Sequence, residues 1–229
     1  MSTEIYKNTI KCAVFDLDGT LLNTINTITH YLNLALSANG LPRVSADECT
    51  GFVGDGARML IKRAICARGE YSEELFERVF ADYNAAYDAN PLYLTEVYEG
   101  VREMLHSLRE GGIKLAVLSN KPHFATCATV NRFFENSFDL ILGGREGVPL
   151  KPDPTVLLEL ISSLGCTPSE CAYIGDSDVD MLTAANAGVA LSLGVSWGYR
   201  SRELLLESGA DTVVDDALDL GRLIFTKNT

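Results

Sequence analysis

Short apolar runs alternate with amphipathic stretches along most of the chain. The apolar runs predict strands at residues 12–17, 113–120, 138–144, 171–176, 189–195 and 211–214. The amphipathic stretches predict helices at about 100–110, 123–134, 154–164, 178–187 and 201–208. Strands that alternate with helices in this way indicate a mostly parallel sheet covered on both faces. Right-handed crossovers then give a doubly wound, Rossmann-like α/β fold.

Residues 23–93 interrupt this alternation. Only helical patterns occur there, at 26–40, 56–69 and 73–88. We therefore expect an inserted all-α domain at 23–93, and a catalytic core assembled from residues 1–22 and 94–229.

Composition narrows the class of protein. The 229 residues are 47% apolar and 22% charged, as in ordinary globular proteins, and the formal net charge is −12. The electrostatic field of a protein with this excess of negative charge repels nucleic acids and anionic membranes, so we expect neither as a partner. The first residues lack a secretory signal pattern and no apolar run approaches the roughly 20 residues that span a bilayer, which favours a cytoplasmic protein. The six cysteines form no C-x-x-C pair, and this spacing argues against a zinc site.

Polar residues gather where the predicted strands end. Asp16 and Asp18 follow the first strand, and a buried Asp16 would need a charged partner. Ligands of doubly wound folds bind at the carboxyl ends of the strands, so we expect the polar groups found there to share one crevice. Besides the first two aspartates these groups are Ser119, Asn120, Lys121, Lys151 and the acidic run Asp176, Asp178 and Asp180.

Four short motifs resemble those of one family. "DLDGTL", "LSN", Lys151 in "LKPDP" and "GDSDVD" occur in the order and at the separations typical of the haloacid dehalogenase-like superfamily. The likeness is to its phosphoglycolate-phosphatase-like branch and covers essentially the whole chain. It implies a Rossmann-like core with a helical cap between the first and second motifs.

The resemblance also implies roles. Asp16 would be the nucleophile that forms an aspartyl-phosphate, and Asp18 the general acid and base. Ser119 and the Asn120 backbone would donate hydrogen bonds to phosphoryl oxygens, and Lys151 would bridge nucleophile and phosphate.

A Mg²⁺ ion is the implied cofactor, because two carboxylates beside a dianionic phosphate need a counter-charge. The resemblance assigns it to the Asp16 side chain, the Asp18 carbonyl and the Asp176 side chain. Asp180 would be an alternative ligand, or it would contact the residues around the ion without contacting the ion itself.

The cap segment carries a weaker signal. Gly54, Gly56 and Leu60 resemble the G-x-G-x-x-x-L segment of phosphoglycolate-phosphatase-like proteins. A glycine loop before a helix favours an anion, and Arg58 in the first turn could bind a substrate carboxylate. The alternative is an ordinary interhelical turn with a solvated Arg58.

We therefore expect a Mg²⁺-dependent phosphatase of a small phosphorylated metabolite, with 2-phosphoglycolate as the first choice of substrate, acting as a monomer or homodimer. Two alternatives stay open: a β-phosphoglucomutase-like sugar phosphomutase, and a non-catalytic phosphate or metal-binding protein. The chain departs from the family pattern at Asn23 and Thr24, where family members commonly have Asp-Ser or Asp-Thr. This departure bears on the choice of substrate more than on the phosphatase chemistry, because neither Asp16 nor Asp18 is changed.

Overall fold

A computed structural model describes residues 9–226 and has an α/β core. The core sheet is parallel, with the strand order β5-β4-β1-β6-β7-β8. Its strands are β1 (Cys12–Phe15), β4 (Lys114–Pro122), β5 (Leu140–Gly144), β6 (Cys171–Gly175), β7 (Leu191–Val195) and β8 (Thr212–Val214). Residues 1–8, on which the prediction about a secretory signal partly rests, lie outside the described residues.

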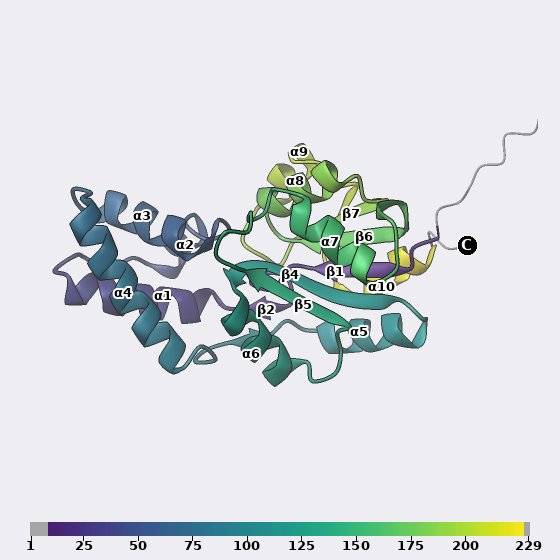
Figure 1. Ribbon diagram of the computed structural model, residues 1–229, viewed down its shortest axis with the longest axis horizontal. Helices are drawn as coiled ribbons and strands as arrows, with labels where there is room; N and C mark the ends of the chain where they lie inside the picture. The colour runs from purple at the N-terminus through teal and green to yellow at the C-terminus, as the bar shows by residue number, and fades with distance from the viewer. Residues whose placement is uncertain (1–8, 227–229) are drawn as a thin grey trace, which may run out of the picture.

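Helices cover both faces of the sheet, which explains why its strands are apolar almost throughout (Figure 1). Ala13 and Phe15 of β1 face the cluster formed with α5 (Val101–Glu110), α6 (His123–Phe133) and α10 (Ala217–Thr226). Cys12 and Val14 face the cluster formed with α7 (Thr155–Ser163) and α8 (Asp178–Ala187). The helix α9 (Arg202–Glu207) contacts β7 and β8.

The predicted doubly wound fold is confirmed. Each strand and helix expected for the core is present, with ends shifted by a few residues. Helix α10 and the short 3₁₀ helix at Pro168–Glu170 were not predicted. The next two core strands after β1, β4 and β5, lie on one side of it, and the last three, β6, β7 and β8, lie on the other side. The strand order therefore reverses at β1. Ligands of such sheets bind at that point.

Four helices lie apart from the sheet, at the left of Figure 1. These are α1 (Ile25–Ala38), α2 (Ala46–Thr50), α3 (Gly56–Arg68) and α4 (Glu73–Ala89), which we call the helical cap. They bury a hydrophobic cluster of their own, which includes Leu32, Ile61 and Val79. The chain enters and leaves the cap through β2 (Leu22–Asn23) and β3 (Glu96–Val97), which pair antiparallel. The two connections therefore lie side by side.

Two core residues contact the cap's hydrophobic cluster. Ala125 of α6 belongs to the cap's buried cluster, and Tyr199, in the loop after β7, packs against it. Within residues 9–226, no helix combines the length and the apolar character needed to cross a membrane.

Candidate active site

Asp16 and Lys151 meet at the carboxyl end of β1. The Lys151 ammonium lies 2.8 Å from Asp16 Oδ1 and 2.7 Å from Asp180 Oδ1. Burial raises the pKa of Asp16 to about 7, although the charge of Lys151 acts in the opposite direction. Burial also lowers the pKa of Lys151, but Asp16 and Asp180 outweigh it and hold that pKa well above its usual value. Lys151 is thus the charged partner that a buried Asp16 requires.

Asp176 lies in the turn between β6 and α8 and is almost fully buried. Its Oδ1 accepts a hydrogen bond from the Thr20 hydroxyl at 3.0 Å, and its Oδ2 accepts one from the Tyr199 backbone N–H at 2.9 Å. A Cβ atom added at Gly19 or Gly198 would lie 2.3 Å or less from an Asp176 atom. The two glycines therefore let the backbone close around this carboxylate.

The acidic cluster fits a divalent cation. Asp16, Asp176 and Asp180 each offer a carboxylate oxygen, and these oxygens lie within 4.8 Å of one another. Hard divalent cations prefer such ligands. Burial, followed by the charges of Asp180 and Asp16, holds the pKa of Asp176 well above its usual value. The crowded cluster would therefore gain from a positive charge beyond Lys151.

Asp180 differs from the other two aspartates because each of its oxygens has two protein donors, whereas each Asp176 oxygen has one. Lys151 and the Tyr173 hydroxyl, at 3.2 Å, contact Oδ1. The Ser177 hydroxyl and backbone N–H donate to Oδ2 at 2.6 and 3.1 Å. This geometry favours the option in which Asp180 holds Lys151 in place and does not contact the ion directly.

Ser119 and Asn120 lie near the end of β4, at the same cavity. The Asn120 amide accepts from the Lys151 backbone N–H at 2.9 Å and donates to the Lys151 carbonyl at 3.1 Å. It also donates to the carbonyl of Gly54 in the cap, at 3.0 Å. The Asn120 side chain therefore fixes the Lys151 loop and touches the cap, a function that its motif did not predict.

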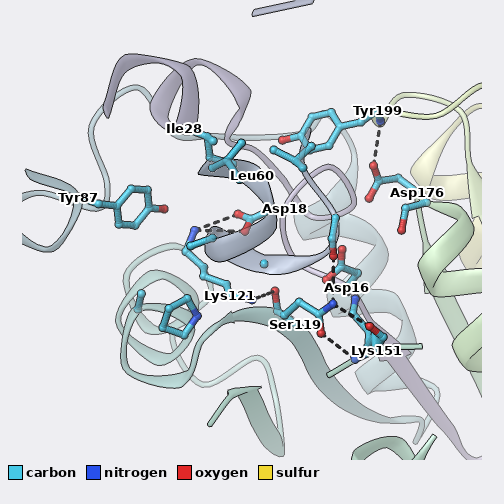
Figure 2. Close-up of a pocket in the computed structure, with 18 of the residues that line it drawn as sticks. Asp16, Asp18, Ile28, Leu60, Tyr87, Ser119, Lys121, Lys151, Asp176 and Tyr199 are labelled. Carbon is cyan, nitrogen blue, oxygen red and sulfur yellow. Dashed lines mark hydrogen bonds and ion pairs between the residues drawn. The ribbon is translucent and has the colours of Figure 1, made fainter. Parts of the chain in front are cut away.

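Asp18 points toward the cap side of the cavity, where Lys121 contacts it (Figure 2). The Lys121 ammonium lies 3.1 and 3.3 Å from the two Asp18 oxygens. Burial lowers the pKa of Lys121, but the charges and hydrogen bonds of Asp18 and Tyr87 together outweigh it, so the net shift is upward. The sequence placed Lys121 at the end of a strand but assigned it no role. A lysine closing an apolar strand was the available signal.

The cavity lies between core and cap and has a volume of about 90 Å³. Besides the residues above, it is lined from the cap by Ile28, Val53, Gly54, Gly56, Ala57, Leu60, Tyr83, Asn84, Tyr87 and Asp88. The predicted glycines Gly54 and Gly56 do reach it, and both have left-handed backbone, with φ of 118° and 81°. Glycine adopts that conformation without strain.

Arg58 does not line the cavity, contrary to its predicted part in substrate binding. Its side chain is 57% exposed, pairs with Glu77 at 2.8 Å and lies over the rings of Phe76 and Phe80. The first turn of α3 directs it away from the glycine loop. The alternative reading of a solvated Arg58 fits this structure.

Arg200 provides the guanidinium at the cavity instead. Its Nη1 donates to the Thr50 carbonyl at 2.5 Å and its Nη2 to the Val53 carbonyl at 2.8 Å, while Nε lies 3.4 Å from Asp178 Oδ1. Arg200 follows β7 by only a few residues, in a loop that carried no motif. Sequence reasoning therefore missed it.

Comparison with known proteins agrees with this geometry. The sequence pattern of the haloacid dehalogenase-like hydrolase family matches residues 13–193. Phosphoglycolate phosphatase of Cereibacter sphaeroides is 38% identical over 189 residues, which are 82% of this chain and 85% of that protein. Phosphoglycolate phosphatase 1 of Pseudomonas aeruginosa is 32% identical over 214 residues, or 92% and 78% of the two chains.

A solved structure is also similar. The crystal structure of a predicted phosphoglycolate phosphatase from Haemophilus somnus superposes with a TM-score of 0.87 and 28% identity, covering 96% of this chain and 99% of that one. The family pattern spans most of the chain, and both sequence relatives exceed 30% identity over most of their length. The chain belongs to the haloacid dehalogenase-like hydrolase family.

Proposed function

We propose that the protein is a Mg²⁺-dependent phosphomonoesterase that hydrolyses a small phosphorylated metabolite, with 2-phosphoglycolate as its first candidate substrate. The observation that carries the proposal is the convergence of Asp16, Asp18, Lys151 and Asp176 on one cavity. The names of the relatives support the choice of substrate.

In this proposal Asp16 attacks phosphorus and the bond to the leaving oxygen breaks, which gives an aspartyl-phosphate and an alcohol. Asp18 donates the proton that the leaving oxygen needs. It then takes a proton from the water that attacks the aspartyl-phosphate, so that phosphate is released and both carboxyl groups return to their starting states. Lys151 and the Ser119 hydroxyl, with the Asn120 backbone, offset the charge of the phosphoryl oxygens.

Asp16, Asp176 and the Asp18 carbonyl would hold the Mg²⁺ ion, and Asp180 would orient Lys151. When bound, the ion neutralises charge between the nucleophile and the phosphate. Asp176 is kept in place by Thr20 and by the Tyr199 backbone, so the residue set that would receive the ion is already ordered.

We also propose that residues 23–93 form a mobile cap domain over the core of residues 1–22 and 94–229, and that closure excludes water from the reaction. Its separate hydrophobic cluster and paired connections support this division. We infer from the net charge of −12 that nucleic acids and membranes are not partners. The cytoplasmic location and the monomeric or dimeric state stay predictions.

The test measures phosphate release from 2-phosphoglycolate with Mg²⁺ and with a chelator. Asp16→Asn should lower kcat by roughly 10³-fold or more, as removal of a nucleophile does. Asp219→Asn is the matched control, because Asp219 is an exposed residue of α10 that pairs with Arg222 at 2.6 Å. Phosphate release that is independent of Mg²⁺, or unchanged in Asp16→Asn, would overturn the proposal.

A further inference from the structure

Lys121 is a buried cation that the proposed phosphoryl chemistry does not use. Its side chain is only 6% exposed, yet it lies on the cap side of Asp18 and not with Lys151 at the acidic cluster. Two of the three protons of an ammonium suffice for the contacts to the Asp18 oxygens. The third donor is left for the side that faces Tyr87, which also helps to raise the pKa of Lys121.

The other two cations at the cavity are more fully engaged. Lys151 contacts two carboxylates, Asp16 and Asp180. Arg200 donates to two backbone carbonyls of the cap and lies near Asp178. Lys151 is thus shared by two carboxylates and Arg200 is held against the cap backbone, whereas Lys121 contacts one carboxylate, that of Asp18.

Tyr87 provides an independent observation. It is 7% exposed and comes from α4 of the cap, on the far side of Lys121 from Asp18 (Figure 2). Within residues 9–226 its buried hydroxyl makes no hydrogen bond of normal geometry. The Lys121 ammonium lies 5.0 Å from its ring centroid. Burial raises the pKa of Tyr87 and the nearby Lys121 ammonium counteracts that rise, so the ammonium and the hydroxyl interact although their geometry is not that of a normal hydrogen bond. An ammonium can only donate, so the hydroxyl proton still lacks an acceptor, and a ligand oxygen at this point would provide one.

We propose that Lys121 and Tyr87 form a subsite for a carboxylate of the substrate, at the opposite end of the cavity from the phosphoryl group. One ammonium and one neutral hydroxyl match a compact monoanion better than a second dianionic phosphate, which would call for more positive charge. The proposal rests on the proposed phosphatase function and specifies its substrate class.

The subsite also connects substrate binding to the chemistry. Lys121 comes from the core and Tyr87 from the cap, so a carboxylate held by both joins the two parts over the reacting group. The same ammonium contacts Asp18, so Lys121 is a positioning residue for the proposed acid and base as well as a specificity residue. A substrate without the carboxylate would lose the contribution of Lys121 to specificity and keep its contribution to the positioning of Asp18.

The experiment compares 2-phosphoglycolate with ethyl phosphate, in which a methyl group replaces the carboxylate. We measure kcat/KM for both in the wild type, Lys121→Met and Tyr87→Phe, with Lys62→Met, an exposed lysine of α3, as the control. The preference of the wild type for phosphoglycolate should fall by about 10- to 100-fold in Lys121→Met, as expected for a hydrogen bond to a charged group. Tyr87→Phe, which removes one hydroxyl, should lower it several-fold, and the control should keep it.

Equal losses on both substrates in Lys121→Met, with no change of preference in Tyr87→Phe, would overturn the subsite and leave Lys121 as a positioning residue alone. If the wild type hydrolyses neither compound, the proposed function fails, and calorimetry with the same two ligands and variants then decides the subsite. Tighter binding of phosphoglycolate that depends on Lys121 supports it, and equal affinity for both ligands overturns it.

Discussion

Arg200 joins the core to the cap, because its Nη2 donates to the Val53 carbonyl at 2.8 Å. The same guanidinium donates to the Thr50 carbonyl. Both carbonyls lie just before the glycine loop that lines the cavity, so Arg200 fixes the part of the cap nearest the proposed phosphate position.

Arg200→Gln should therefore weaken cap closure. We expect kcat/KM to fall by about 10-fold, the loss of one or two hydrogen bonds to a charged donor. Amide hydrogen exchange at residues 50–56 should become faster in the same variant. Arg78→Gln serves as the control, since Arg78 is an exposed residue of α4 paired with Glu74. Unchanged exchange at 50–56 would show that Arg200 does not hold the cap.

Asp180 and Asp176 should differ in their effect on the metal. Because each Asp180 oxygen already has two protein donors and each Asp176 oxygen only one, Asp180→Asn should lower kcat by about 10- to 100-fold while the half-saturating Mg²⁺ concentration changes little. Asp176→Asn should raise that concentration more than 10-fold, since it removes a proposed ligand. Titration of activity with Mg²⁺ separates the two. A larger rise for Asp180→Asn would reassign it as a direct ligand.

Mg²⁺ should also stabilise the fold. At 100 times its dissociation constant, a ligand specific to the folded state adds about 2.7 kcal/mol to the free energy of unfolding. For a chain of this size that corresponds to a rise in Tm of about 5–10 °C. Differential scanning calorimetry with Mg²⁺ and with a chelator measures the shift. Asp176→Asn should reduce it strongly, and an undiminished shift in that variant would place the stabilising ion elsewhere.

The core strands could be predicted because a sheet covered on both faces leaves near-continuous apolar runs such as 12–15. The same topology brings the ends of β1, β4 and β6 together, so Asp16, Ser119 and Asp176 could be expected at one crevice. Strands β2 and β3 have two residues each, too few for a periodic pattern to show.

The cap side of the site could not be predicted in the same way. The positions of Tyr87 and Arg200 depend on how α4 and the loop after β7 dock across the cavity, and no local pattern encodes that docking. Arg58 illustrates the converse, because its place beside a glycine loop suggested a ligand contact while its helix turned it toward Phe76 and Phe80. The roles of the individual site residues stay predictions until variants are measured.

Gly198→Ala should disturb the site without removing any charged group. An added Cβ would lie 2.1 Å from the Asp176 Cβ, an atom that cannot move without its backbone. We expect a loss of about 1–3 kcal/mol in the free energy of unfolding, as in other overpacked sites, and weaker Mg²⁺ binding. Gly221→Ala in α10 is the matched control, since its added Cβ would meet Met104 at an ordinary 3.6 Å and the helix interior favours alanine. Chemical denaturation and Mg²⁺ titration of both variants provide the comparison. If Gly198→Ala matches the control in both measurements, the close packing around Asp176 is not what holds that carboxylate in place.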